Sequence, residues 1–225
     1  TPLCTPWDIE SLVLLEGYGM DAYKVASADF TNYEILEALA KTHKPLICST
    51  GMSNELEVVK SSNFLGTLGA QCIFLHCNST YPTPYKDINL KYIHHLKDLT
   101  GSLVGYSGHE RGFIVALAAI SMGAKVIEKH VTLDKTLEGN DHKVSLNPKE
   151  FKEFVNSARD IEEALGNNGP REITQGELLN REDLAKSLIA KGKIKKGNKI
   201  KRNDIAIKSP GQGIQPNRIN ELIGK

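Results

Sequence analysis

Residues 104–112 read VGYSGHERG and residues 123–132 read GAKVIEKHVT, and an apolar, Ala-rich run from Phe113 to Met122 joins them. Each flank is short and β-prone, and each contains a histidine near its end, His109 in the first and His130 in the second. Gly123 follows the apolar run as a glycine commonly follows the last turn of a helix. The order strand, helix, strand predicts a parallel sheet built from β/α units.

The two histidines occupy equivalent places in consecutive units. In a (β/α)8 barrel the C-terminal ends of neighbouring strands open into one mouth, where catalytic groups collect. Two imidazoles in that mouth could share one divalent metal, since histidine is the usual nitrogen ligand of such ions. A single histidine at a strand end is more often a hydrogen-bonded structural residue, so the pair by itself does not identify a reaction.

Composition excludes several classes of protein. The 225 residues carry 28 Lys and Arg against 27 Asp and Glu, so no net charge draws the chain to nucleic acid or an anionic membrane. No apolar run is long enough to span a bilayer, and the first residues do not resemble a signal peptide. The cysteines show no C-x-x-C spacing, which is typical of reduced thiols in a cytoplasmic protein: Cys4, Cys48, Cys72 and Cys77.

Strand-like segments recur at helix-length intervals, which predicts five or six consecutive β/α units centred on Lys24, Ile47, Phe74, Val104 and Ile127. Three capping signals predict helix starts: Thr31 with Glu34, Ser53, and Asn147 with Pro148 and Glu150. Small hydroxyl side chains follow most of the strands. They suit a phosphate ligand at the mouth, although serine and threonine are also common N-caps.

The composition changes after Gly166. Residues 167–186 are predicted to be a linker that begins with Asn-Asn-Gly-Pro, and residues 187–225 a small, mostly β domain rich in lysine. Because Thr1 falls in an apparent strand end, we expect the chain to be part of a longer polypeptide.

Several motifs in fixed order resemble the sialic acid synthase family. They are HCNSTYPTP at 76–84, GYSGH at 105–109, EKH at 128–130, YKVASAD at 23–29, CSTGM at 48–52 and NDHK at 140–143. The tail, with IKKG at 194–197 and SPGQGI at 209–214, resembles the antifreeze-like (SAF) domain of that family. The resemblance covers nearly the whole chain. It implies a (β/α)8 TIM barrel, here incomplete because its first strands would precede Thr1, followed by an incomplete SAF domain.

The resemblance also implies a reaction, in which phosphoenolpyruvate condenses with N-acetylmannosamine or a related amino sugar and phosphate is released. His109 and His130 match the ligands of a divalent metal, usually manganese, with magnesium or cobalt as alternatives. Lys24, Asp29 and Asp141 match catalytic positions, and both aspartates would contact the acceptor sugar. The positions that match the phosphoenolpyruvate site are Thr5, Lys24, Ser27, Ser49, Ser79, Tyr81 and Ser107. Exchange of the tail between subunits would give a homodimer.

The acceptor stays open at this point. Asp29 stands where many members of the family have Glu, and Ser209 stands where an Arg is common. The acceptor could be N-acetylmannosamine, its 6-phosphate or a diacetamido sugar, as in legionaminate and pseudaminate synthases. Related synthases of seven- and eight-carbon keto acids lack such a tail. An alternative from another functional class is a remnant that binds carbohydrate or phosphate and catalyses no reaction.

Glu128 could orient His130 or pair with a basic neighbour.

Overall fold

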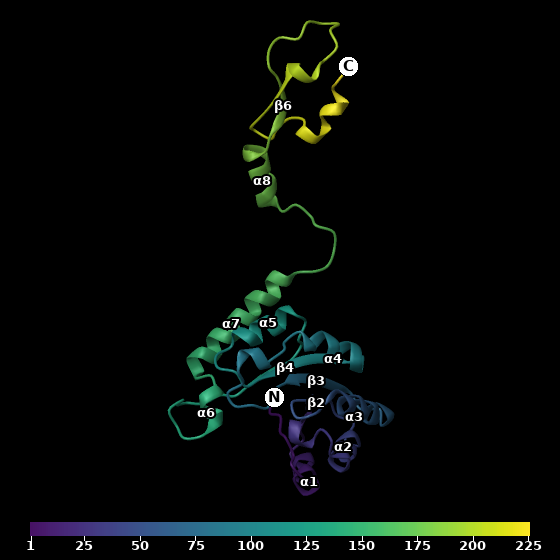
Figure 1. Ribbon diagram of the computed structural model, residues 1–225, viewed down its shortest axis with the longest axis vertical. Helices are drawn as coiled ribbons and strands as arrows, with labels where there is room; N and C mark the ends of the chain where they lie inside the picture. The colour runs from purple at the N-terminus through teal and green to yellow at the C-terminus, as the bar shows by residue number, and fades with distance from the viewer. The chain divides into compact units, whose positions relative to one another are not determined.

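A computed structural model describes residues 1–225, which form two compact units, Thr1–Gly166 and Asn167–Lys225. The first unit contains one parallel sheet whose five strands are ordered as in the sequence (Figure 1). The strands are β1 (Tyr23–Val25), β2 (Leu46–Ser49), β3 (Cys72–Cys77), β4 (Leu103–Gly108) and β5 (Ile127–Lys129). This α/β sheet matches part of a TIM-type barrel, as the sequence predicts.

Helices precede, connect and follow the strands. They are α1 (Ile9–Gly17), α2 (Tyr33–Ala40), α3 (Glu55–Thr67), α4 (Tyr92–Thr100), α5 (Ile114–Ser121), α6 (Asn140–Val144) and α7 (Pro148–Leu165). Short 3-10 turns lie at η1 (Ser27–Asp29) and η2 (Tyr85–Asp87). Isolated parallel bridges extend the sheet at both edges, from Cys4 to Tyr23 and from Val131 to Leu146.

The strands bury one set of alternate side chains beneath the helices. Tyr23 and Val25 of β1, and Leu46 and Cys48 of β2, are almost fully buried. Because side chains alternate along a strand, the residues between them, such as Lys24, point to the other face. The side chains on one face of the sheet therefore form the packed core. Those on the other face are free to form a site at the strand ends.

Two of the three helix starts differ from the prediction. Asn32, not Thr31, precedes α2 and makes no cap hydrogen bond; its side-chain NH2 donates to Asp29 Oδ1 over 3.2 Å. Asn54, not Ser53, caps α3 in a capping box with Glu57. The third prediction is confirmed: the Asn147 side chain accepts the Glu150 N–H, and the Glu150 carboxylate accepts the Asn147 N–H, each over 2.9 Å.

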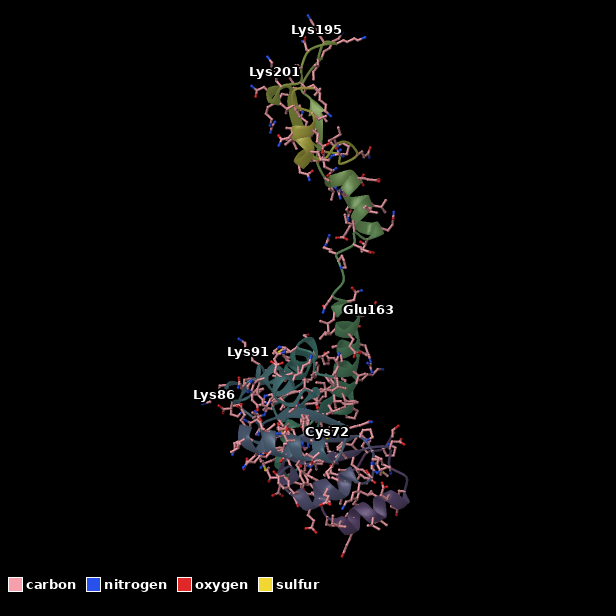
Figure 2. All side chains as sticks on the ribbon, turned by 90° about the vertical axis from the view of Figure 1, so that its right-hand side faces the viewer. Cys72, Lys86, Lys91, Glu163, Lys195 and Lys201 are labelled. Carbon is pink, nitrogen blue, oxygen red and sulfur yellow. The ribbon has the colours of Figure 1, made fainter.

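The second unit contains α8 (Gln175–Leu184) and an antiparallel pair, β6 (Ser187–Ala190) with β7 (Ile205–Lys208). The 3-10 turns η3 (Arg202–Asp204) and η4 (Pro216–Glu221) complete it. The segment expected as a linker thus contains a helix, because Thr174 and Glu177 form a capping box that was not predicted. Lys195 and Lys201 lie in the exposed, lysine-rich segment between the two strands (Figure 2). No helix of either unit is long and apolar enough to cross a membrane.

Candidate active site

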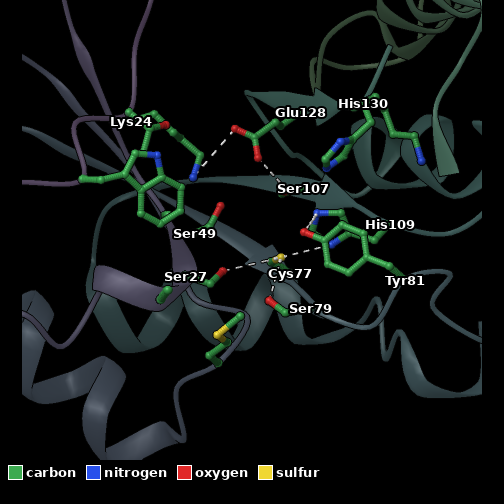
Figure 3. A pocket seen from close by; sticks show the side chains of 16 residues that line it. Lys24, Ser27, Ser49, Cys77, Ser79, Tyr81, Ser107, His109, Glu128 and His130 are labelled. Carbon is green, nitrogen blue, oxygen red and sulfur yellow. Dashed lines mark hydrogen bonds and ion pairs between the residues drawn. The ribbon is translucent and has the colours of Figure 1, made fainter. Parts of the chain in front are cut away.

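A cavity of about 370 Å³ lies where the strands of the parallel sheet end (Figure 3). That volume is in the usual range for a small-molecule site. Its wall includes every residue that was predicted from the sequence to bind phosphoenolpyruvate or the metal: Thr5, Lys24, Ser27, Ser49, Ser79, Tyr81, Ser107, His109 and His130. These residues come from six successive segments of the chain, and the parallel order of the strands brings them together.

Lys24 is the cation on one side of the cavity. Its side chain is 13% exposed, and its Nζ donates to the Val25 carbonyl over 2.7 Å and lies 3.8 Å from Glu128 Oε2. Burial lowers the pKa of Lys24, and the charge of Glu128 partly offsets that effect. A largely buried ammonium with one distant carboxylate is well suited to an anionic ligand.

Ser27, Ser49 and Ser79 form an open group of hydroxyls on the Lys24 side of the cavity, which we call the cradle. The Oγ of Ser49 is buried and has no hydrogen-bond partner, although it borders the cavity. Ser27 Oγ accepts the Gly51 N–H over 3.0 Å. A Cβ on Gly51 would lie 2.5 Å from Ser79 Oγ and 2.8 Å from Cys77 Sγ, so only glycine leaves this space free. An oxygen-rich ligand would give Ser49 the partner that it lacks.

The two imidazoles stand together on the other side of the cavity, with ring centroids 5.3 Å apart. His109 is 5% exposed, and its Nδ1 lies 2.8 Å from the Asn78 carbonyl oxygen. Since that oxygen can only accept, Nδ1 carries the hydrogen and Nε2 has a free electron pair. Burial lowers the pKa of His109, which favours the neutral ring.

Tyr81 covers this pair of rings. Its ring lies 4.0 Å from that of His109 and 5.6 Å from that of His130, measured between centroids. The hydroxyl lies 2.8 Å from His109 Nε2 and donates its hydrogen to that nitrogen. Burial, together with the charges of Cys77, Asp141 and Glu128, raises the pKa of Tyr81 to about 12, so the phenol is protonated at neutral pH.

Glu128 is the carboxylate that lines the cavity. Its Oε1 accepts the Ser107 hydroxyl over 2.7 Å, and its Oε2 faces Lys24 (Figure 3). The side chain is 41% exposed. Of the two roles left open by the sequence, pairing with a basic neighbour is the one the structure supports.

Asp29 and Asp141 do not line the cavity. Asp29 lies in η1, where Oδ1 accepts from Asn32 and Oδ2 is buried without a partner. Asp141 lies in α6, close enough for its charge to raise the pKa of Tyr81. Their contact with an acceptor sugar is therefore still a prediction.

Seven residues of the wall were not predicted as site residues: Trp7, Ala26, Ala28, Met52, Cys77, Glu128 and Lys129. Cys77 is a free and buried thiol, as expected for a reduced cysteine at the end of a strand, and it also borders the cavity 3.6 Å from His109 Nδ1. Its place at the end of β3, just before Ser79, was a signal for it. Trp7 and Met52 are 63% and 64% exposed, and nothing in their sequence context marked them.

A divalent metal fits the imidazole pair chemically. A histidine that binds a metal through one nitrogen commonly donates the other N–H to a backbone carbonyl, as His109 does to Asn78. A metal on Nε2 would displace the Tyr81 hydroxyl from that nitrogen. The chain contains no cluster of three or more His, Cys, Asp or Glu side chains arranged to hold a metal. The two imidazoles would therefore share the ion with water or substrate.

A profile of the NeuB family matches residues 1–169. The chain is 42% identical over 226 residues to an N,N'-diacetyllegionaminic acid synthase of Campylobacter jejuni, covering 99% of this chain and 67% of that protein. It is 38% identical over 205 residues to the N-acetylneuraminate-9-phosphate synthase of Homo sapiens, covering 90% of this chain and 57% of that protein. A crystal structure of an N-acetylneuraminic acid synthetase from Leptospira borgpetersenii superposes with a TM-score of 0.73 at 35% identity, covering 80% of this chain and 64% of that one. The chain belongs to the NeuB family of sialic acid synthases.

Proposed function

We propose that the protein condenses phosphoenolpyruvate with an N-acetylated amino sugar to form a sialic-type nonulosonic acid and free phosphate. The observation that carries the proposal is the division of one cavity into a cationic, hydroxyl-lined side and a side with two imidazoles. The first side suits the phosphate and carboxylate of phosphoenolpyruvate. The second suits the metal-assisted activation of an aldehyde.

Lys24 and the hydroxyl groups of the cradle bind phosphoenolpyruvate. The ammonium offsets the charge of the ligand, and Ser49 Oγ gains a partner. Thr5, Ser79 and Ser107 border the same space and position the ligand further. Because these groups are fixed by the strand ends, they hold the enol carbon in place without reorganising during the reaction.

His109 and His130 hold the divalent ion, for which manganese is our first choice and magnesium or cobalt are alternatives. Such an ion would polarise the aldehyde of the open-chain sugar, so that the aldehyde carbon becomes a better electrophile. Tyr81 stays protonated and can donate a hydrogen bond to an oxygen beside the rings. Asp29 and Asp141 are assigned to the sugar hydroxyl groups by family resemblance.

In the reaction C3 of phosphoenolpyruvate forms a bond to the aldehyde carbon, and the aldehyde oxygen takes up a proton. Water adds to the resulting cationic C2 and loses one proton, which leaves a C2 hydroxyl. The bond from C2 to the phosphate oxygen then breaks, the C2 hydroxyl gives its proton to the departing phosphate, and C2 becomes the keto group of the product. We assign the acceptance of the proton from water to Glu128, because it is the carboxylate that lines the cavity and Ser107 holds it in place.

The acceptor is tested with a panel that contains N-acetylmannosamine, its 6-phosphate and a diacetamido sugar. Phosphate release and product mass are measured with manganese present. Release that needs both phosphoenolpyruvate and one of these sugars supports a synthase, and the sugar used decides between sialate-, legionaminate- and pseudaminate-type activity. Binding of phosphoenolpyruvate without release in the presence of any sugar supports the non-catalytic alternative.

The assembly and location of the protein are further parts of the proposal. A homodimer in which the tail of one subunit covers the cavity of the other would exclude water from the intermediate. The four thiols are free, which agrees with the cytoplasmic location that we propose. Size-exclusion chromatography with light scattering tests the dimer directly.

A further inference from the structure

The ends of β4 and β5 carry different chemistry on their two faces. Ser107 and His109, and Glu128 and His130 on the neighbouring strand, border the cavity. The residues that alternate with them, Tyr106 and Glu110 on one strand end and Lys129 on the other, form a second polar cluster. We call these three residues the Tyr-Glu-Lys cluster. Two of its members directly neighbour a histidine in the sequence, Glu110 next to His109 and Lys129 next to His130.

The Tyr-Glu-Lys cluster is almost completely buried. The side chains of Glu110 and Lys129 are each 1% exposed, and Lys129 Nζ lies 3.2 Å from Glu110 Oε1. The same Nζ donates to the Glu110 carbonyl over 2.9 Å, and the Tyr106 hydroxyl donates to Glu110 Oε2 over 2.7 Å. A Cβ on Gly108 would lie 2.7 Å from Glu110 Oε2, so this glycine leaves room for the carboxylate.

Stability alone gives little reason for this arrangement. Burying two charges carries a large desolvation penalty, and apolar residues of similar volume often stabilise a core as well or better. The cluster instead joins the residue after His109 to the residue before His130. With Lys129 bonded to both the backbone and the side chain of Glu110, the two strand ends cannot shift independently.

We propose that Glu110 and Lys129 are positioning residues that fix the separation and orientation of the His109 and His130 rings. This inference rests on the proposed metal role of the two rings, and it adds residues that act only through them. Lys129 borders the cavity, but its side chain is only 1% exposed and its Nζ is bonded to the Glu110 carbonyl and carboxylate. Its charge is therefore directed at Glu110 and not into the cavity.

The test uses the triple variant Tyr106→Phe, Glu110→Met and Lys129→Met, which removes all three polar side chains together, so that no charged or hydroxyl group of the cluster is left unpaired; the Glu110 carbonyl loses its bond from Lys129. A matched control exists near the N-terminal ends of two other strands, β1 and β2. There Glu16 accepts the Tyr23 hydroxyl and lies 2.5 Å from Lys44 Nζ. The control variant is Tyr23→Phe, Glu16→Met and Lys44→Met. This second cluster has the same residue types but is more exposed, at 25% for Lys44 and 38% for Glu16.

Three quantities are measured for each protein: the thermal unfolding midpoint, the affinity for Mn2+ from the free-ion electron paramagnetic resonance signal, and the imidazole NMR signals without metal. We expect the triple variant to fold and to bind Mn2+ about 10- to 100-fold more weakly, as when a residue that supports a metal ligand is removed. The signals of His109 and His130 should shift or broaden. The control variant should show wild-type affinity and histidine signals.

A folded triple variant with wild-type Mn2+ affinity and unchanged histidine signals would overturn the inference. If the triple variant does not fold, the single variants Lys129→Arg and Glu110→Asp test the inference instead, because each keeps the charge of the side chain but changes its length. Wild-type affinity and histidine signals in both would likewise overturn it. If the wild-type protein itself does not bind Mn2+, the proposed metal role is wrong, and the metal-free histidine spectra still decide whether the cluster positions the rings.

Discussion

Replacing Lys24 with methionine should weaken phosphoenolpyruvate binding far more than it lowers the stability of the fold. Methionine keeps most of the length of the lysine stem and removes only the ammonium group. In the structure the lysine side chain is 13% exposed and borders the cavity beside Ser49, whose hydroxyl has no partner. The variant therefore removes the cation from an otherwise unchanged binding surface.

The size of the effect depends on the hydrogen bond that the ammonium group would donate to the ligand. A hydrogen bond to a charged group contributes about 1.5–3 kcal/mol, which corresponds to a roughly 10- to 150-fold rise in the dissociation constant. The decrease in folding free energy should be less than about 1 kcal/mol, because the partner Glu128 is 41% exposed and keeps its hydrogen bond from Ser107.

The chain contains a single tryptophan, Trp7, and it lies in the cavity wall. Its fluorescence can therefore report phosphoenolpyruvate binding in a direct titration, with thermal unfolding measured in parallel. Lys44→Met is the control, because Lys44 lies outside the cavity wall. An unchanged dissociation constant for Lys24→Met, or a decrease in stability as large as the decrease in binding free energy, would refute the reasoning.

The same residue predicts a pH dependence. Phosphoenolpyruvate binding needs the charged ammonium, and burial lowers the pKa of Lys24 in the folded protein. Affinity should therefore fall as pH rises through this lowered pKa, at a lower pH than an exposed lysine would give. In Lys24→Met this fall should be absent, and a fall of the same size in that variant would contradict the assignment.

Three further predictions concern the imidazoles, the cradle and the tail. His109→Ala and His130→Ala should both abolish manganese-dependent turnover. In His109→Ala the free energy of unfolding should also fall by about 1 kcal/mol, because the hydrogen bond to the Asn78 carbonyl is removed. Gly51→Ala should leave the protein folded but raise the Michaelis constant for phosphoenolpyruvate about tenfold or more, because its Cβ would displace Ser79 and Cys77. Deletion from Arg171 onward should yield a monomer with reduced turnover and an unchanged unfolding midpoint of the first unit.

Each of these has a result that would contradict it. Normal turnover of either histidine variant at saturating manganese means that the assignment of the two rings as the ligands of a required ion is wrong. A wild-type Michaelis constant for Gly51→Ala means that the cradle does not hold the phosphate or carboxylate. Full activity of the tail-deleted protein as a monomer, shown by light scattering and phosphate release, makes the tail an accessory domain.

The sequence predicts the parallel sheet well because buried parallel strands are short apolar runs with polar residues at their ends. The same alternation places Lys24 and His109 at one mouth, and the structure brings both to the same cavity. Helix starts are less predictable, since Asn32 and Asn54 compete with neighbouring hydroxyl residues for the cap position and only the surrounding structure decides.

Partners of a side chain are the hardest feature to predict. Glu128 is two residues from His130, and the sequence left open whether it orients that ring or pairs with a basic neighbour. In the structure it accepts from Ser107 on the neighbouring strand and faces Lys24 of β1. The buried pair of Glu110 and Lys129 left no mark in the sequence either, because two charged residues beside histidines are equally typical of a solvated surface.

The most direct test of the central proposal is phosphate release from phosphoenolpyruvate by the purified protein, with the acceptor panel and manganese. We predict release only when phosphoenolpyruvate, manganese and an N-acetylated amino sugar are all present, with one nonulosonic acid formed for each phosphate. Lys24→Met and His130→Ala should suppress both products together. Phosphate release that does not depend on the sugar, or a wild-type rate in both variants, would contradict the assignment of this cavity as the site of condensation.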